Sequence, residues 1–287
     1  MQLLKGTMTM KTSALRLLLI LGLTALLSMP VAARSAKRWN DKMPPAAGAP
    51  RSIGLYTSGC IQGAQALPST GPGFQTIRRS RQRFFGHPAL IQYIQGLGQI
   101  MDTEDLGILS IGDLGQARGG PIPSAHRSHQ TGLDVDIWFW LQPRSRPMTT
   151  TERETAQPPS MVTNGRLALS PKQWTPRQMR LMEAAAGFEN VERIFVTPPV
   201  KQALCKGYPG AAWLRKVRPW WGHRAHLHVR LRCPHGDPAC VNQPPPPEGD
   251  GCDATLAWWF TDEARRPPRG KSKPTPMPEA CQAVLAK

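Results

Sequence analysis

The sequence predicts an α+β fold, with a central antiparallel sheet, flanking helices, long loops and three disulfides. Three observations point to this class. Hydrophobic residues make up 40% of the 287 positions, which is enough to fill a core. The 30 prolines are about twice the average share and indicate long loops. Segments with helical spacing also occur between short strand-like runs.

Residues 1–33 have the parts of a secretory signal peptide: a basic start, the apolar run Leu17–Leu27, and small residues ending at Ala33. The run is short for a bilayer and no stop-transfer pattern follows, so a retained membrane anchor is the less favoured interpretation. We expect cleavage after Ala33, with Ala36 as second choice. Residues 34–287 are then exported as a single domain that is not embedded in a membrane.

Three helices are predicted from their start signals and apolar spacing. Pro88 suits a first helical turn, Thr175-Pro176 opens a second helix, and Pro198 or Pro199 can start a short third one. The supporting positions are Leu90, Ile94, Leu97 and Met101 in the first helix, Leu181 and Ala185 in the second, and Cys205 at the end of the third.

Strands are predicted at Leu106–Ile111, Arg193–Val196, Asp134–Trp138 and from His226 onward. The last two alternate polar and apolar residues with period 2, so each has one apolar face. Both carboxylates of the Asp134 segment then share a face, as do the imidazoles of His226 and His228. Residues 34–50 and the proline-rich arm at about 244–280 resemble linkers or extended arms.

Six cysteines in an exported chain favour three disulfides, whereas in the cytosol they would suggest thiol ligands for a metal. No C-x-x-C occurs, and Cys233 and Cys240 flank a turn that a local bridge could close. The residues themselves leave all other pairings open.

The net charge is +17, and removal of the three cations in residues 1–33 leaves +14. Such a field favours a polyanionic partner. Because an exported, disulfide-bearing chain seldom meets nucleic acid, an anionic cell-wall polymer fits better. A basic surface that only aids solubility is the alternative.

Five of the seven histidines fall in two short segments, 124–136 and 220–228. A histidine from the turn before Gly132, an aspartate from the first strand and a histidine from the second can converge on one cation. Two imidazoles and a carboxylate suit Zn²⁺ and leave a fourth position for water, as in catalytic sites. The alternative is a hydrogen-bonded polar cluster or surface patch, the interpretation we keep for His87 and His235.

The motifs are similar to those of the penicillin-insensitive murein endopeptidases, relatives of D-Ala-D-Ala dipeptidases and lysostaphin-type zinc peptidases. The resemblance runs from about Leu55 to Cys281. It is carried by I-G-D-L-G-Q at 111–116, S-H-Q-T-G-L-D-V-D at 128–136, R-I-F-V at 193–196, W-L-R-K-V-R-P-W at 213–220 and H-R-A-H-L-H-V-R-L-R-C at 223–233.

The resemblance implies a periplasmic enzyme that cleaves D-alanyl–meso-diaminopimelyl cross-links of murein (peptidoglycan), with one Zn²⁺ per chain. Some members of the family are dimers, so it also allows a homodimer. A second zinc is not expected, because Asn164 and Leu167 stand where some relatives have an acidic residue and a histidine. Carried over by position, the zinc ligands are His129, Asp136 and His228, with His126 as a candidate further ligand, and the uncoordinated active-site histidines are His223 and His226. The family's disulfides correspond to Cys60–Cys281, Cys205–Cys252 and Cys233–Cys240.

The chain has no H-E-x-x-H motif, so His226, two residues from a predicted ligand on the same strand face, is the best general base. His223 would stabilise the oxyanion or protonate the leaving amine. Asp134 could orient a ligand imidazole or be a solvated carboxylate. Neither S-x-x-K nor G-x-S-x-G occurs, so there is no acylated serine for penicillin to trap.

Substrate carboxylates could be bound by Arg127, Arg224 or Arg230, each of which could equally be a surface or strand-face cation. Other functions remain open at this point: a carboxypeptidase or dipeptidase acting on murein peptides, a secreted metallo-nuclease, or a non-catalytic wall-binding protein.

Overall fold

The computed structural model describes residue 39 and residues 43–122, 127–163, 167–266 and 275–287. The predicted signal peptide, His126 and Asn164 lie outside the described residues. Trp39–Lys287 form one unit of the fold. None of the described helices is long and apolar enough to cross a membrane.

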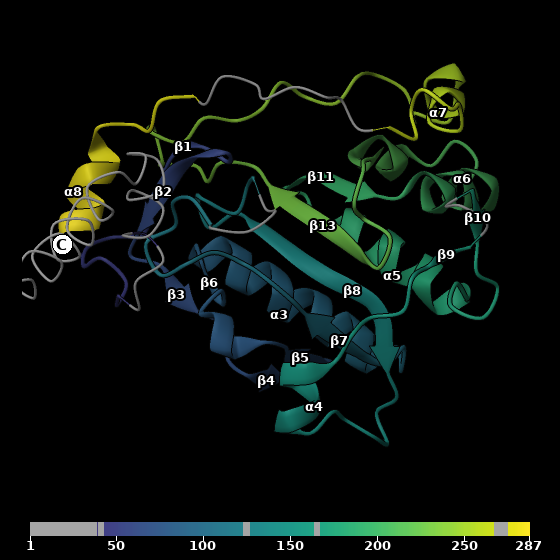
Figure 1. Ribbon diagram of the computed structural model, residues 1–287, viewed down its shortest axis with the longest axis horizontal. Helices are drawn as coiled ribbons and strands as arrows, with labels where there is room; N and C mark the ends of the chain where they lie inside the picture. The colour runs from purple at the N-terminus through teal and green to yellow at the C-terminus, as the bar shows by residue number, and fades with distance from the viewer. Residues whose placement is uncertain (1–38, 40–42, 123–126, 164–166, 267–274) are drawn as a thin grey trace, which may run out of the picture. The chain divides into compact units, whose positions relative to one another are not determined.

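A seven-stranded sheet forms the centre of this unit (Figure 1). In spatial order its strands are β12 (Val217–Pro219), β11 (Val191–Val196), β13 (His226–Leu231), β8 (Asp134–Gln142), β7 (Ile108–Ile111), β5 (Phe74–Thr76) and β4 (Thr70–Gly71). The central pairs are antiparallel, while β11 with β12 and β5 with β7 are parallel. The α+β class with a central sheet is confirmed, with a parallel pair added toward each edge.

The two faces of β8 and β13 differ in polarity as the period-2 pattern predicts. The apolar residues on one face are fully buried in the main core; they are Val135, Ile137 and Phe139 in β8, and Leu227, Val229 and Leu231 in β13. On the other face, antiparallel pairing sets His228 opposite Asp136 and Arg230 opposite Asp134. Directly opposed residues share a face of the sheet, so these four polar side chains are brought together.

Helices α3 (Pro88–Thr103) and α5 (Pro176–Gly187) lie alongside the sheet, and their buried residues belong to the main core (Figure 1). The Nδ1 of His87 accepts a hydrogen bond from the N–H of Ala89 at the start of α3. Thr175 and Gln178 form a capping box at the start of α5. With α6 (Pro198–Gly207), all three predicted helices begin at the expected prolines.

Smaller elements surround this centre. The two-stranded pairs are β1 (Arg51–Leu55) with β2 (Ser58–Gln62), β3 (Gln65–Ala66) with β6 (Phe85–Gly86), and β9 (Val162–Thr163) with β10 (Ala168–Leu169). In the described part of the chain the other helices are α4 (Thr150–Thr155), α7 (Ala254–Trp258) and α8 (Ala280–Ala286), with 3₁₀ turns η1 (Arg79–Arg81) and η3 (Ala212–Lys216).

Three disulfides join Cys60 to Cys281, Cys205 to Cys252 and Cys233 to Cys240, the pairing that the resemblance implied. The first attaches α8 to β2, and the second attaches the segment before α7 to α6. The described parts of the proline-rich arm pack against the fold, because Arg193 and Arg215 donate hydrogen bonds to carbonyl oxygens of Pro244, Pro246 and Pro247.

The segment before β1 also packs, which differs from the linker expected there. Trp39 and Ala46 are buried in a second apolar cluster with Cys60, Cys281 and Val284. The proline, alanine and glycine content of this segment suggested an extended arm, but its few apolar side chains are enough to fasten it to β2 and α8.

Candidate metal centre

His129 lies in the turn that leads into β8, and its side chain is fully buried. Its backbone adopts a left-handed conformation, φ 67°, which is uncommon for a residue other than glycine. The backbone N–H of His129 donates a hydrogen bond of 2.9 Å to the Oδ2 of Asp134, which stabilises this turn. Gly132, with φ 72°, completes the turn where a side chain would meet Ile61 and the backbone of His87. The turn therefore directs the imidazole of His129 toward the polar face of β8.

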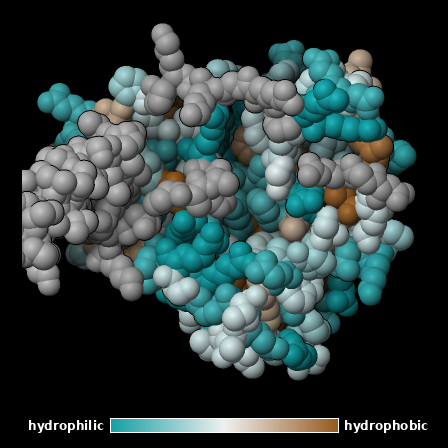
Figure 2. Space-filling model, in the orientation of Figure 1, coloured by the Kyte–Doolittle hydropathy of each residue, from teal (hydrophilic) through white to brown (hydrophobic). Residues whose placement is uncertain are grey.

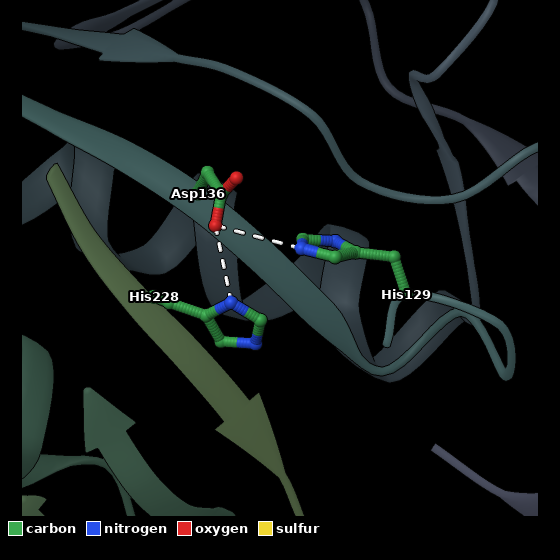
Figure 3. Close-up of side chains that lie close together, drawn as sticks. All are labelled: His129, Asp136 and His228. Atoms are coloured by element: carbon green, nitrogen blue, oxygen red, sulfur yellow. Dashed lines mark ion pairs between the residues drawn. The ribbon is translucent and has the colours of Figure 1, made fainter. Parts of the chain in front are cut away.

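The three side chains predicted as ligands converge on this face (Figure 3). The Oδ1 of Asp136 lies 3.5 Å from the Nε2 of His129 and 3.2 Å from the Nδ1 of His228. One ligand atom from each residue lies within 4.8 Å of the others, so a single ion can contact all three. Among the described residues, this is the group of His, Cys, Asp or Glu side chains with that geometry. Two imidazoles and a carboxylate are donors that a divalent metal ion accepts.

Asp134 and Arg230 support this group from the adjacent register position. Asp134 is fully buried, and its Oδ1 lies 3.1 Å from the Nε2 of His228. Arg230 donates to both carboxylate oxygens, at 2.7 and 3.2 Å. With its Nε2 bonded to Asp134, His228 presents its Nδ1 to Asp136 and the metal position. Of the two interpretations of Asp134, the structure supports the one that orients a ligand imidazole.

The two buried aspartates beside the predicted ligands are ionised, so their negative charge favours a positive charge between these side chains. Burial opposes ionisation of Asp134, but Arg230 and His228 outweigh it and hold the pKa of Asp134 well below its usual range. The pKa of Asp136 is likewise held low against burial, mainly by His226 and His129. Burial disfavours protonation of His228, yet its two carboxylate neighbours raise its pKa to about 9.

His223 and His226 lie next to each other beside the three predicted ligands. The side chain of His226 is 23% exposed, and its Nε2 is 3.7 Å from the Oδ1 of Asp136. The rings of His223 and His226 are 5.0 Å apart, and those of His223 and His228 are 5.8 Å apart. Burial, with His226 and His228 nearby, lowers the pKa of His223 to about 3. His223 is therefore a neutral imidazole at neutral pH.

Two cavities open onto the cluster from different sides. The first, about 300 Å³, is lined by Asp136, His226 and Trp138 with Arg78 and Arg81. The second, about 370 Å³, is lined by residues that include His223, His228, Arg127, Trp220 and Trp221. In Figure 2 the surface is hollowed over β13, and the visible lining is hydrophilic. The predicted ligands can therefore be reached through cavities lined by Asp136 and by His228.

The predicted arginines have different environments. Arg230 is buried and bonded to Asp134, so it is a strand-face cation, while Arg127 and Arg224 are exposed and line cavities. Leu167 is also exposed, at a cavity edge. Phe195 belongs to the R-I-F-V motif but was not predicted as a site residue, and its ring lies 5.4 Å from that of His228. Phe195 and Arg193 are two residues apart in one strand, so they share a face of it. The pairing of this strand with β13 sets Phe195 opposite His228.

A buried group of two histidines and an aspartate next to two cavities is typical of one class of protein, the metal-dependent hydrolases. A family model described as penicillin-insensitive murein endopeptidase matches residues 52–286. Three proteins named penicillin-insensitive murein endopeptidase are similar to the chain. The Klebsiella pneumoniae protein is 44% identical over 91% of this chain and 96% of its own length. The Yersinia pestis protein is 42% identical (93% and 96%), and that of Pectobacterium atrosepticum 43% identical (94% and 95%).

The chain belongs to the penicillin-insensitive murein endopeptidase family. The resemblance drawn from the motifs is thereby confirmed. The match covers the seven-stranded sheet, the arm and all three disulfides, which is most of the described unit.

Proposed function

We propose that this chain is a periplasmic zinc endopeptidase that hydrolyses D-alanyl–meso-diaminopimelyl cross-links of murein. The observation that carries the proposal is the convergence of His129, Asp136 and His228 in a member of this family. Their donor set fits Zn²⁺, one per chain. When bound there, the ion supplies a Lewis acid for the scissile carbonyl and lowers the pKa of water toward ~7.

The remaining chemistry is done by side chains. The Nε2 of His226 accepts the proton of the attacking water. This atom lies 3.7 Å from the Oδ1 of Asp136, and the side chain of His226 is partly exposed in the 300 Å³ cavity. His223, whose ring lies 5.8 Å from that of His228, is neutral and stabilises the developing oxyanion through its ring N–H, and the proton that His226 has taken from the water passes to the leaving amine. Asp134 and Arg230 hold the imidazole of His228 in one orientation.

Export is part of the proposal. We infer that residues 1–33 are removed after Ala33 and that residues 34–287 act as one domain in the periplasm. The three disulfides support an oxidising compartment. A homodimer stays a prediction, which light scattering of the purified chain measures.

The test uses the purified mature chain and murein fragments containing cross-linked dimers. We expect dimers to disappear and monomers to accumulate, with loss of activity in a chelator and recovery when Zn²⁺ is added. His228→Ala should remove turnover and keep the circular dichroism spectrum of the fold. Release of free D-alanine without loss of dimers would instead indicate a carboxypeptidase. Undiminished hydrolysis by the His228→Ala variant would show that the ligand assignment is wrong.

A further inference from the structure

Four tryptophans gather beside the candidate metal centre. Trp220 and Trp221 follow β12, while Trp258 and Trp259 end α7, far along the chain. The ring centroids of Trp221 and Trp259 are 4.6 Å apart, and those of Trp220 and Trp221 are 5.1 Å apart. Trp258 lies 5.2 Å from Trp259. The cluster therefore joins two segments that are distant in sequence.

This cluster keeps a large aromatic surface exposed to solvent. Trp220 is 48% exposed and Trp258 is 39% exposed, so both belong to the small set of large hydrophobic side chains exposed in the described part of the chain. Grouped exposed aromatic rings are typical of binding sites, whereas scattered ones are common on any surface. The grouping thus indicates a ligand rather than a packing defect.

The cluster is held in place by the fold. The Nε1 of Trp221 donates a hydrogen bond of 2.6 Å to the carbonyl oxygen of Ala264. The segment leading to α7 is attached to α6 by the Cys205–Cys252 disulfide, and the Nζ of Lys201 donates to the carbonyl oxygen of Asp250. Figure 1 shows α7 beside α6. A site fixed in this way loses little freedom when a ligand binds.

A cavity of about 350 Å³ lies against these rings. Trp220, Trp221 and Trp259 line it, together with the guanidinium-bearing Arg224 and Arg265. Its size falls in the range of small-molecule sites. Trp220 and Trp221 also line the cavity that reaches His223 and His228, so the two cavities are neighbours.

We propose that this tryptophan pocket binds N-acetylhexosamine units of the glycan strand whose peptide is being cut. A pyranose ring has an apolar C–H face that packs on the electron-rich face of an indole, and its hydroxyl and acetamide oxygens accept hydrogen bonds from arginine. The inference rests on the proposed function, because murein is the polymer that places sugars next to cross-linked peptides. The pocket would hold the sugar while the peptide extends toward His228.

The first experiment measures sugar binding by calorimetry, with the full mature chain and chitotetraose as the probe. We expect saturable binding that Trp259→Ala weakens at least tenfold. Trp213→Ala is the matched control, because Trp213 is half-buried against Tyr208 and lines neither of the two cavities. Absence of binding to the unmodified chain, or equal binding by Trp259→Ala, would overturn the proposal.

The second experiment compares two substrates: cross-linked dimers that carry their sugars, and dimers freed of sugar. We expect Trp259→Ala to lower the ratio of kcat/KM for the first over the second about tenfold, and Trp213→Ala to leave it unchanged. An equal fall with both substrates would assign the pocket to the peptide and overturn the glycan site. If the unmodified chain cleaves neither, the proposed function fails, while chitotetraose binding still tests the pocket.

Discussion

Asp134 shows how one buried residue can position another. It receives hydrogen bonds from the backbone of His129 and from Arg230, and it faces the Nε2 of His228. Its carboxylate thereby fixes both the turn that carries one predicted ligand and the ring orientation of a second. Contacts of this kind around a metal ligand matter for affinity almost as much as the ligands themselves.

Replacing Asp134 with Asn should lower zinc affinity about 10–100-fold, because the amide leaves His228 free to change its ring orientation and tautomer. Competition with a chromogenic chelator measures the affinity, and circular dichroism checks that the variant is folded. An Asp134→Asn variant that is folded and binds zinc as tightly as the unmodified chain would exclude the positioning role.

His226 is expected to act on the reaction without holding the metal. The His226→Ala variant should lose about 10²–10⁴-fold in kcat while retaining one zinc per chain, since general bases contribute in that range. Kinetics on cross-linked dimers and metal analysis of the same sample separate the two effects. Loss of zinc together with activity would make His226 a ligand instead.

The candidate ligands could be predicted from sequence because their positions obey strand periodicity. His228 and Asp136 occupy polar positions of two strands, and a single antiparallel register brings them face to face. The same register brings the guanidinium of Arg230 to the carboxylate of Asp134. The register itself pairs two strands that are far apart in the chain, so no local sequence pattern specifies it. The left-handed backbone of His129 depends on the same contacts and could not be foreseen.

At the scale of the elements, local signals were the reliable ones. Prolines preceded by a capping residue marked the starts of α3 and α5 correctly, because capping is decided within one turn of helix. Strand β12 at one edge of the sheet and strand β5 next to the other edge were not predicted, since their parallel partners lie far away in the chain. The packing of the proline-rich arm was also left open, because it depends on arginines donating to its carbonyl oxygens.

Helix α6 contains a buried lysine that should affect stability as pH changes. Burial, with Arg218 nearby, lowers the pKa of Lys201 to about 8, against the attraction of Asp250 and Asp253. The unfolded chain has the ordinary lysine pKa of 10.5, so between these values it binds more protons than the folded chain. Folding stability should therefore rise with pH across this window.

From pH 7 to 9.5 the unmodified chain should gain about 2 kcal/mol in the free energy of unfolding relative to Lys201→Met. Urea unfolding of both proteins at the two pH values measures the difference. The variant has its own baseline stability, so only the change with pH is compared. Parallel pH curves for the two chains would contradict the assigned pKa.

At the scale of the whole molecule, the tryptophan pocket and the cavity at His223 and His228 are neighbours, because Trp220 and Trp221 line both. Composition alone predicted a polyanionic or cell-wall partner, and the family assignment agrees with it. The tryptophan pocket was not predicted, because its two segments meet only in the folded chain. The spacing of the cysteines likewise left the disulfide pairing open until the resemblance was considered.

Metal binding should stabilise the whole fold, because the three ligands come together only in the folded state. At a zinc concentration 100 times its Kd, the gain is about 2.7 kcal/mol and Tm rises accordingly. Thermal unfolding with and without zinc measures the shift. His228→Ala should show little or no shift, and a rise in Tm as large as that of the unmodified chain would place the metal elsewhere.

The most direct test of the account is anomalous diffraction at the zinc absorption edge from crystals grown with Zn²⁺. We expect one peak within about 2.0–2.2 Å of an imidazole nitrogen of His129, the Nδ1 of His228 and a carboxylate oxygen of Asp136. A peak at another position, or no peak between these side chains, would contradict it.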